Sequence, residues 1–146
     1  MKTLSNHLGQ FEYEDTEIIS VAEGLLGFEH LTEFILVNFE ETLPFKWLVS
    51  IEEPMIAFPL INPSLVEQNY SIELNKENVD AKLLLHPESN LVYSIVNFSD
   101  HKPTLNLRGP VIINEKEKFG MQLVLNDDKY AFRHPLNVPQ PETEKE

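Results

Sequence analysis

The chain of 146 residues contains no cysteine, one tryptophan and only two arginines. The lack of cysteine excludes a disulfide framework and a thiolate metal site, and it is compatible with the cytoplasm. Apolar runs such as Ile35-Leu36-Val37 fall far short of the roughly 20 residues that a membrane-spanning helix needs. The amino-terminal residues are polar and lead into no hydrophobic segment. We therefore expect neither a membrane span nor a signal peptide.

Positive charge is scarce. Eleven basic residues stand against 24 acidic residues, which gives a formal net charge of -13. A field of that sign repels phosphate backbones and raises the local concentration of basic partners. We therefore expect no direct binding of nucleic acid. The alternative interpretation is that the excess of acidic residues serves solubility alone.

Catalytic patterns are missing as well. The five histidines show no spacing that would aim two imidazoles at one metal ion. The paired carboxylates Glu52-Glu53 and Asp127-Asp128 adjoin turn residues, where solvated charges are expected rather than an acid and base dyad. Gly24 and Gly27 lack the Lys that follows in a phosphate-binding loop. We predict a binding protein without enzymatic activity, cofactor or metal. An enzyme of unknown type is the alternative that the histidines and paired acids leave open.

Short stretches of alternating apolar and polar residues, bounded by Gly, Pro, Asn and Asp, are the main pattern that is present. They predict strands at residues 10–14, 18–21, 33–39, 45–51, 55–61, 70–74, 91–98, 105–114 and 119–125. Pro59 marks its strand as an edge or bulged strand, whereas apolar residues on both sides of residues 91–98 predict a central strand. The predicted fold is all-β, mostly antiparallel and β-barrel-like, with one or two short helical turns.

One such domain is expected over residues 1–136, because a chain of this length has enough apolar material for a single core. Residues 137–146 hold two prolines and three glutamates, which predicts a disordered acidic tail.

The stretch LNLRGPVIIN (105–114) organises the second half of the chain. Proline cannot donate a ladder hydrogen bond, and glycine permits unusual backbone angles, so Gly109-Pro110 predicts a corner between two strand halves. The turn at residues 114–117 then leads into the next strand, which predicts a β-hairpin. Farther upstream, Gly24 and Gly27 in EGLLGF predict a loop that folds back on the core.

Arginines and aromatic residues have an ordinary interpretation. Arg108 and Arg133 are each expected to hold a local carboxylate in a bidentate pair. Phe58 is expected in the core. For Trp47 the core and an interface remain equally open, since tryptophan is also a common interface anchor.

Four segments resemble the flagellar assembly factor FliW family. They are EGLLGFEHLTEF (23–34), PFKWLVSIEEPMIAFPLINP (44–63), NLRGPVIIN (106–114) and RHPL (133–136), and with their spacing they extend the match over about residues 10–136. Leu26 stands where the family pattern has a second proline. The resemblance implies a small, cytoplasmic, β-barrel-like protein without enzymatic activity. It also implies two partners: flagellin, bound near its C-terminal end, and the RNA-binding translational repressor CsrA, which is bound when flagellin has been exported.

Two hypotheses place these partners on the chain. In the first, an acidic surface faces CsrA and relieves the repression of flagellin mRNA; its candidate residues are Glu12, Glu14, Asp15, Glu17, Phe45, Trp47 and Glu52. In the second, the protein is a flagellin chaperone only, and an apolar groove shields an amphipathic flagellin helix; its candidate residues are Phe28, Leu48 and Phe58.

Overall fold

The computed structural model describes residues 1–98, 102–126 and 129–136, and its centre is a closed β-barrel. Seven strands form the barrel in the order β7-β6-β5-β4-β3-β10-β9, and β9 pairs back onto β7. Every pair is antiparallel except the one between β3 and β10. The strands are β3 (Ile19–Ser20), β4 (Glu33–Asn38), β5 (Lys46–Ser50), β6 (Ala57–Ile61), β7 (Asn90–Asn97), β9 (Val111–Asn114) and β10 (Phe119–Gln122).

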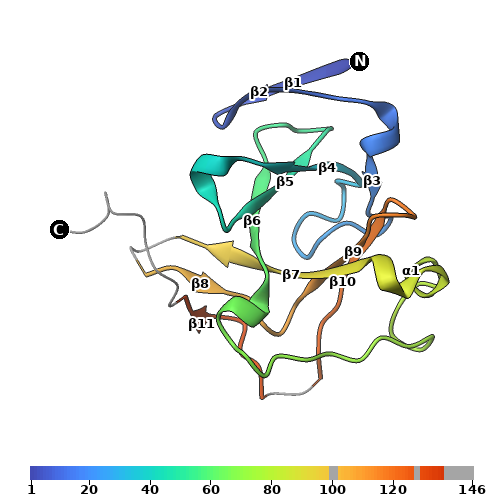
Figure 1. Cartoon of the computed structure of the whole chain (residues 1–146), viewed down its shortest axis with the longest axis vertical. Helices are drawn as coiled ribbons and strands as arrows, with labels where there is room; N and C mark the ends of the chain where they lie inside the picture. The colour runs from blue at the N-terminus through green and yellow to red at the C-terminus, as the bar shows by residue number, and fades with distance from the viewer. Residues whose placement is uncertain (99–101, 127–128, 137–146) are drawn as a thin grey trace.

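Smaller elements surround the barrel. The hairpin of β1 (Lys2–Asn6) and β2 (Gly9–Tyr13) lies across one side (Figure 1). Two short strands, β8 (Thr104–Leu105) and β11 (His134–Pro135), extend the sheet from β7. The helical turns are η1 (Asp15–Glu17), η2 (Glu40–Thr42), η3 (Pro63–Leu65), η4 (Pro87–Ser89) and α1 (Lys82–Leu85). The predicted all-β, barrel-like and mostly antiparallel fold is confirmed, with more helical turns than the one or two expected.

Two predictions about strands are wrong. Residues 70–74 form no strand; instead, the Tyr70 hydroxyl donates to the Leu107 carbonyl (2.7 Å) and the Ser71 N–H donates to the Tyr130 hydroxyl (3.1 Å). Hydrogen bonds to side chains therefore fix this segment, and it forms no β-ladder. Pro59 marks neither an edge nor a bulge, because β6 lies between β5 and β7 and its register with β5 is regular through Pro59. The chain accommodates the missing N–H because pairing with β7 begins only at Leu60.

The predicted corner at Gly109-Pro110 is confirmed. β8 ends at Leu105 and β9 begins at Val111. Between them, the Asn106 Oδ1 accepts hydrogen bonds from the N–H groups of Arg108 (3.1 Å) and Gly109 (2.7 Å). The predicted hairpin follows as the antiparallel pair β9 and β10. A side chain that accepts from backbone two and three residues ahead is the usual means by which asparagine fixes a turn.

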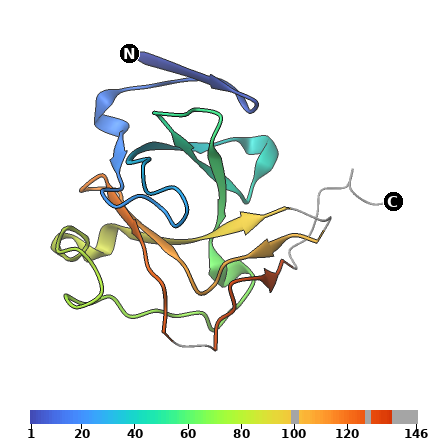
Figure 2. The same ribbon diagram turned by 180° about the vertical axis from the view of Figure 1, so that it is seen from behind.

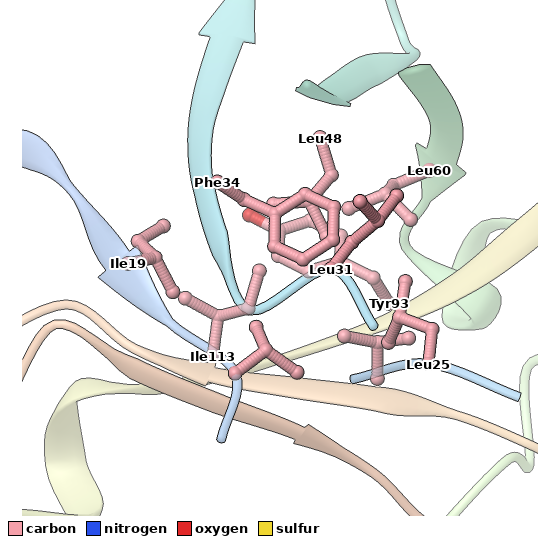
Figure 3. Close-up of a cluster of buried hydrophobic side chains, with 10 residues drawn as sticks. Ile19, Leu25, Leu31, Phe34, Leu48, Leu60, Tyr93 and Ile113 are labelled. Carbon is pink, nitrogen blue, oxygen red and sulfur yellow. The ribbon is translucent and has the colours of Figure 1, made fainter. Parts of the chain in front are cut away.

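The loop that connects β3 to β4, residues 21–32, closes one end of the barrel, and we call it the plug loop. Figures 1 and 2 show it in blue across the barrel opening. Its Leu25 and Leu31 are only 1% exposed and join the core. In Figure 3 these two side chains gather with Ile19, Phe34, Leu48, Leu60, Tyr93 and Ile113 from the barrel strands. The plug loop therefore completes the hydrophobic core, as the EGLLGF pattern predicts.

Candidate functional site

An apolar cleft of about 330 Å³ lies on the outer side of the plug loop. While Leu25 points into the core, Leu26 is 56% exposed and Phe28 is half-buried. The Phe28 ring packs edge to face against Phe58 of β6, with 5.1 Å between ring centroids. Other apolar lining comes from Ile95 of β7 and from Phe132, and the polar lining includes Asn106, Gln122 and Arg133.

The structure assigns the predicted groove residues to different places. Phe28 and Phe58 line the apolar cleft together, and Phe58 also packs against the core. Leu48, in contrast, is completely buried inside the barrel and lines no groove. Leu48 and Phe58 pair across β5 and β6 and so share the same face of the sheet, but Leu48 is fully buried, whereas half-buried Phe58 reaches the cleft. Leu26, which stands at the proline position of the family pattern, is a cleft residue that the sequence prediction missed.

Gln122 joins two segments that are far apart in the sequence. Its Oε1 accepts a hydrogen bond from the Leu26 N–H (2.9 Å), and its Nε2 donates to the Gly109 carbonyl (2.9 Å). One side-chain amide thus ties the plug loop to the corner before β9. Sequence reasoning missed this role because Gln122 occupies an ordinary polar position in an alternating strand. The cleft is therefore held together by contacts between the segments that carry the family resemblance.

The two arginines do not hold carboxylates in the described part of the chain, so that prediction is wrong for these residues. Arg108 Nε donates to the Leu125 carbonyl (3.0 Å), and its guanidinium lies 5.2 Å from the centroid of the Phe132 ring. Arg133 is exposed and lines the cleft. A planar guanidinium stacks on an aromatic face as readily as it pairs with an acid, which accounts for the arrangement of Arg108.

The predicted acidic residues near the amino terminus are all exposed. Two of them have cationic partners, since Asp15 lies 3.0 Å from the Lys2 Nζ and Glu14 lies 3.8 Å from the terminal amino group. The hydrogen bond and charge of Asp15 raise the pKa of Lys2. Glu17 accepts from the Glu14 N–H (2.8 Å). Glu12 is the member of the set with no polar partner among the described residues, so local pairing reduces the free negative charge of this surface.

Phe45 lies just before β5, and Trp47 lies on it. The Phe45 ring packs edge to face against Phe98, with centroids 5.5 Å apart. The Trp47 indole N–H donates to the Thr42 hydroxyl (3.1 Å), and the ring packs in the cluster beneath the β1 and β2 hairpin. Both side chains are half-buried. The two aromatic residues therefore belong to different hydrophobic clusters, and the structure does not bring them together as one patch.

Glu52 serves the fold. Its carboxylate accepts hydrogen bonds from the Thr32 N–H (3.1 Å), the Thr32 hydroxyl (3.1 Å) and the Glu33 N–H (3.2 Å). Partial burial raises the pKa of Glu52, but these hydrogen bonds together outweigh it and hold the pKa below its ordinary value. Glu52 thus anchors the end of the plug loop to the turn between β5 and β6.

We expect Glu52→Gln to lower the free energy of unfolding at pH 7 by about 1 kcal/mol, a modest value because the group is exposed. The pKa of Glu52 is lower in the folded state, so its stabilisation exists above the ordinary carboxyl pKa and is lost as pH falls through the folded value. Urea unfolding from pH 7 to pH 3 should show the difference from the wild type shrinking below pH 4.5. Glu53→Gln is the matched control, since Glu53 contacts the exposed His30 ring (3.3 Å). A pH-independent loss in Glu52→Gln would contradict the assignment.

The other histidine with acidic neighbours among the described residues is His86. His86 lies between Glu88 (3.7 Å) and Glu117 (3.4 Å). In the described ranges, no three His, Asp or Glu side chains are grouped so as to hold a metal ion. Asp127-Asp128 lie outside the described residues. Likewise, none of the helices described here is long and apolar enough to cross a membrane.

A plugged, seven-stranded barrel with an apolar cleft beside its plug loop defines a small β-barrel protein. The model of the FliW protein family matches residues 2–136. The chain belongs to the FliW family of flagellar assembly factors. FliW proteins are flagellar assembly factors, and they are not a known enzyme family.

Individual relatives agree with this assignment. The flagellar assembly factor FliW of Thermosipho africanus is 35% identical over 136 residues, which cover 91% of this chain and 94% of the relative. That of Clostridium tetani is 36% identical over 138 residues, covering 93% and 95%. A crystal structure of the flagellar assembly factor FliW superposes with a TM-score of 0.83 at 27% identity, covering 94% of this chain and 98% of that one.

Proposed function

We propose that this flagellar assembly factor binds flagellin and, when free of it, binds CsrA and so relieves the repression of flagellin mRNA. The apolar cleft is the observation that carries the flagellin half of the proposal. Exposed Leu26 and Phe132 and half-buried Phe28 offer an apolar surface of the kind that an amphipathic partner helix covers. The proposed place of action is the cytoplasm, where translation occurs.

Net charge supports the CsrA half of the proposal. A chain with a formal charge of -13 attracts a basic RNA-binding protein and repels the RNA itself. Bound beside the RNA site of the repressor, an acidic domain raises the electrostatic cost of phosphate approach without covering that site. The proposal therefore involves a protein partner and no direct contact with nucleic acid.

A second candidate is a flagellin chaperone with no role in translation. It is favoured by the ion pairs that Glu14 and Asp15 already form and by the structural hydrogen bonds of Glu52. These contacts reduce the charge available to a basic partner, while the apolar surface of the cleft stays accessible to flagellin.

Fluorescence anisotropy of a labelled flagellin-leader RNA, preloaded with CsrA, distinguishes the two candidates. Titration with this protein should lower the anisotropy, and later addition of flagellin should restore it. No fall, together with intact flagellin binding in a parallel titration, would leave the chaperone alone.

A charge-reversed variant tests which surface meets CsrA. Glu12→Lys with Glu14→Lys should weaken CsrA binding about tenfold at low salt and less at high salt, because exposed charges are screened. Glu73→Lys with Glu77→Lys changes the net charge equally at exposed positions elsewhere. Equal effects of both pairs would assign the attraction to the overall field and contradict the proposed surface. Flagellin binding should be unchanged in both variants.

A further inference from the structure

The apolar cleft differs in charge from the rest of the molecule. The chain has 24 acidic residues among 146, yet among the residues that the structure describes no Asp or Glu lines the cleft. Its charged lining residue is Arg133. The other arginine of the chain, Arg108, stacks on Phe132, which also lines the cleft. One arginine of this strongly acidic protein thus lines the cleft, and the other stacks on a side chain that lines it.

Arg133 is the cationic group there with free donors. It is exposed, and among the described residues it forms no ion pair or hydrogen bond. Arg108, in contrast, donates its Nε–H to the Leu125 carbonyl. Gln122 uses both ends of its amide within the fold. A guanidinium with unused donors beside apolar side chains is suited to bind a carboxylate in a bidentate manner.

We propose that the apolar cleft receives a segment that carries a carboxylate beside its apolar side chains, and that Arg133 binds this carboxylate. The proposal rests on the proposed function, in which the segment belongs to flagellin. A volume of about 330 Å³ accommodates a few side chains of such a segment rather than a whole helix. Recognition therefore depends on anchors: apolar side chains against Phe28 and Phe58, and one acid at Arg133.

Charge also separates the two partners proposed for this protein. An acidic, apolar segment is repelled by the overall field of a protein with a net charge of -13, whereas the cleft offers it a cation beside apolar side chains. A basic protein such as CsrA meets the opposite arrangement, attraction over the acidic surface and repulsion at Arg133. Specificity of this kind uses an attractive contact for one partner and a repulsive one for the other.

The test is the affinity of a labelled peptide from the C-terminal segment of flagellin for the full chain, measured by fluorescence anisotropy. Arg133→Glu should weaken binding about tenfold, because a like charge replaces the partner of the carboxylate. Lys116→Glu, at an exposed position in the turn between β9 and β10, makes the same change in net charge and should have less than a twofold effect. A peptide with Lys in place of its acids should bind Arg133→Glu better than it binds the wild type.

That charge-swapped rescue cannot come from damage to the fold. Equal losses in Arg133→Glu and Lys116→Glu would assign the effect to the general field and overturn the proposal. Self-association that Arg133→Glu abolishes would place a second copy of the chain in the cleft, and it would overturn the proposal as well.

Failure of the proposed function is recognised separately, as absence of flagellin binding to the wild type. In that case two synthetic amphipathic peptides, alike in their leucines but carrying Glu or Lys, test the cleft alone. A preference for the Glu peptide that Arg133→Glu reverses supports the cleft chemistry in a protein whose overall charge favours the Lys peptide. Binding of neither, or preference for the Lys peptide, overturns it.

Discussion

Replacing Gly24 with alanine should lower the free energy of unfolding by about 3 kcal/mol, the sum of backbone strain and a steric clash. Gly24 has φ of +68°, where an L side chain is strained. An added Cβ would lie 2.5 Å from the Glu29 Cα and 2.6 Å from the Phe28 carbonyl oxygen. Both are backbone atoms, so no rotation of a side chain relieves the clash. Urea unfolding followed by tryptophan fluorescence measures the loss.

Gly27→Ala is the matched control in the same loop. Gly27 has φ of +85°, but an added Cβ meets nothing within 4 Å. Only the backbone strain remains, and a loss of about 1 kcal/mol is expected. Equal losses at the two positions would show that Gly24 is not closely packed against the backbone of Phe28 and Glu29. Gly24→Ala should also weaken the proposed binding of flagellin, because Leu26 and Phe28 follow it in the loop that lines the cleft.

The core strands were predictable because their patterns are local. Residues 33–39, 45–51 and 91–98 each hold runs of β-branched and aromatic residues, and the structure has β4, β5 and β7 there. β1 was missed because KTLSN offers a single buried side chain, Leu4. The opposite error was made at residues 70–74, where a strand was predicted and none forms. An alternating pattern becomes a strand only where a neighbouring strand is available to pair with it.

The cleft was only half predictable. Phe28 and Phe58 could be named from the sequence because each is a large apolar residue in a motif. The roles of Leu26, Gln122 and Arg133 depend on contacts between segments up to 96 residues apart, and no local pattern records them. Charge has the same limit. Composition gives the net charge of the chain, but it does not show that Lys2 pairs with Asp15.

The plug loop connects stability with binding. Its successive leucines have different roles, since Leu25 is buried in the core beneath the cleft and Leu26 is exposed at the cleft. Gly24 sets the backbone conformation near its start. Gln122 binds the Leu26 N–H in its middle, and the Glu52 carboxylate binds Thr32 at its end. The cleft is therefore preorganised by the same contacts that close the barrel, which lowers the entropy that a partner must overcome on binding.

Where the barrel closes, Asn114→Ala should lower the free energy of unfolding by about 3 kcal/mol, because it removes a fully buried side chain and leaves several part-buried polar groups without partners. Asn114 of β9 is fully buried opposite Asn90 of β7. Its Nδ2 donates to the His86 carbonyl (2.9 Å) and to the Asn90 Oδ1 (2.7 Å). Its Oδ1 accepts from the N–H groups of Lys116 (3.0 Å) and Glu117 (2.9 Å). One side chain thus joins the closing strand pair to the turn before β10.

Asn62→Ala is the control for this change, because Asn62 also accepts hydrogen bonds from its own turn, but at the surface. Its Oδ1 accepts from the Ser64 N–H (3.0 Å) and the Ser64 hydroxyl (2.8 Å), which water replaces readily. We expect a loss of about 0.5 kcal/mol at Asn62. Urea unfolding should therefore separate the two variants by a wide margin. Similar losses would mean that water reaches the groups around Asn114, and that the barrel is closed there by strand pairing alone.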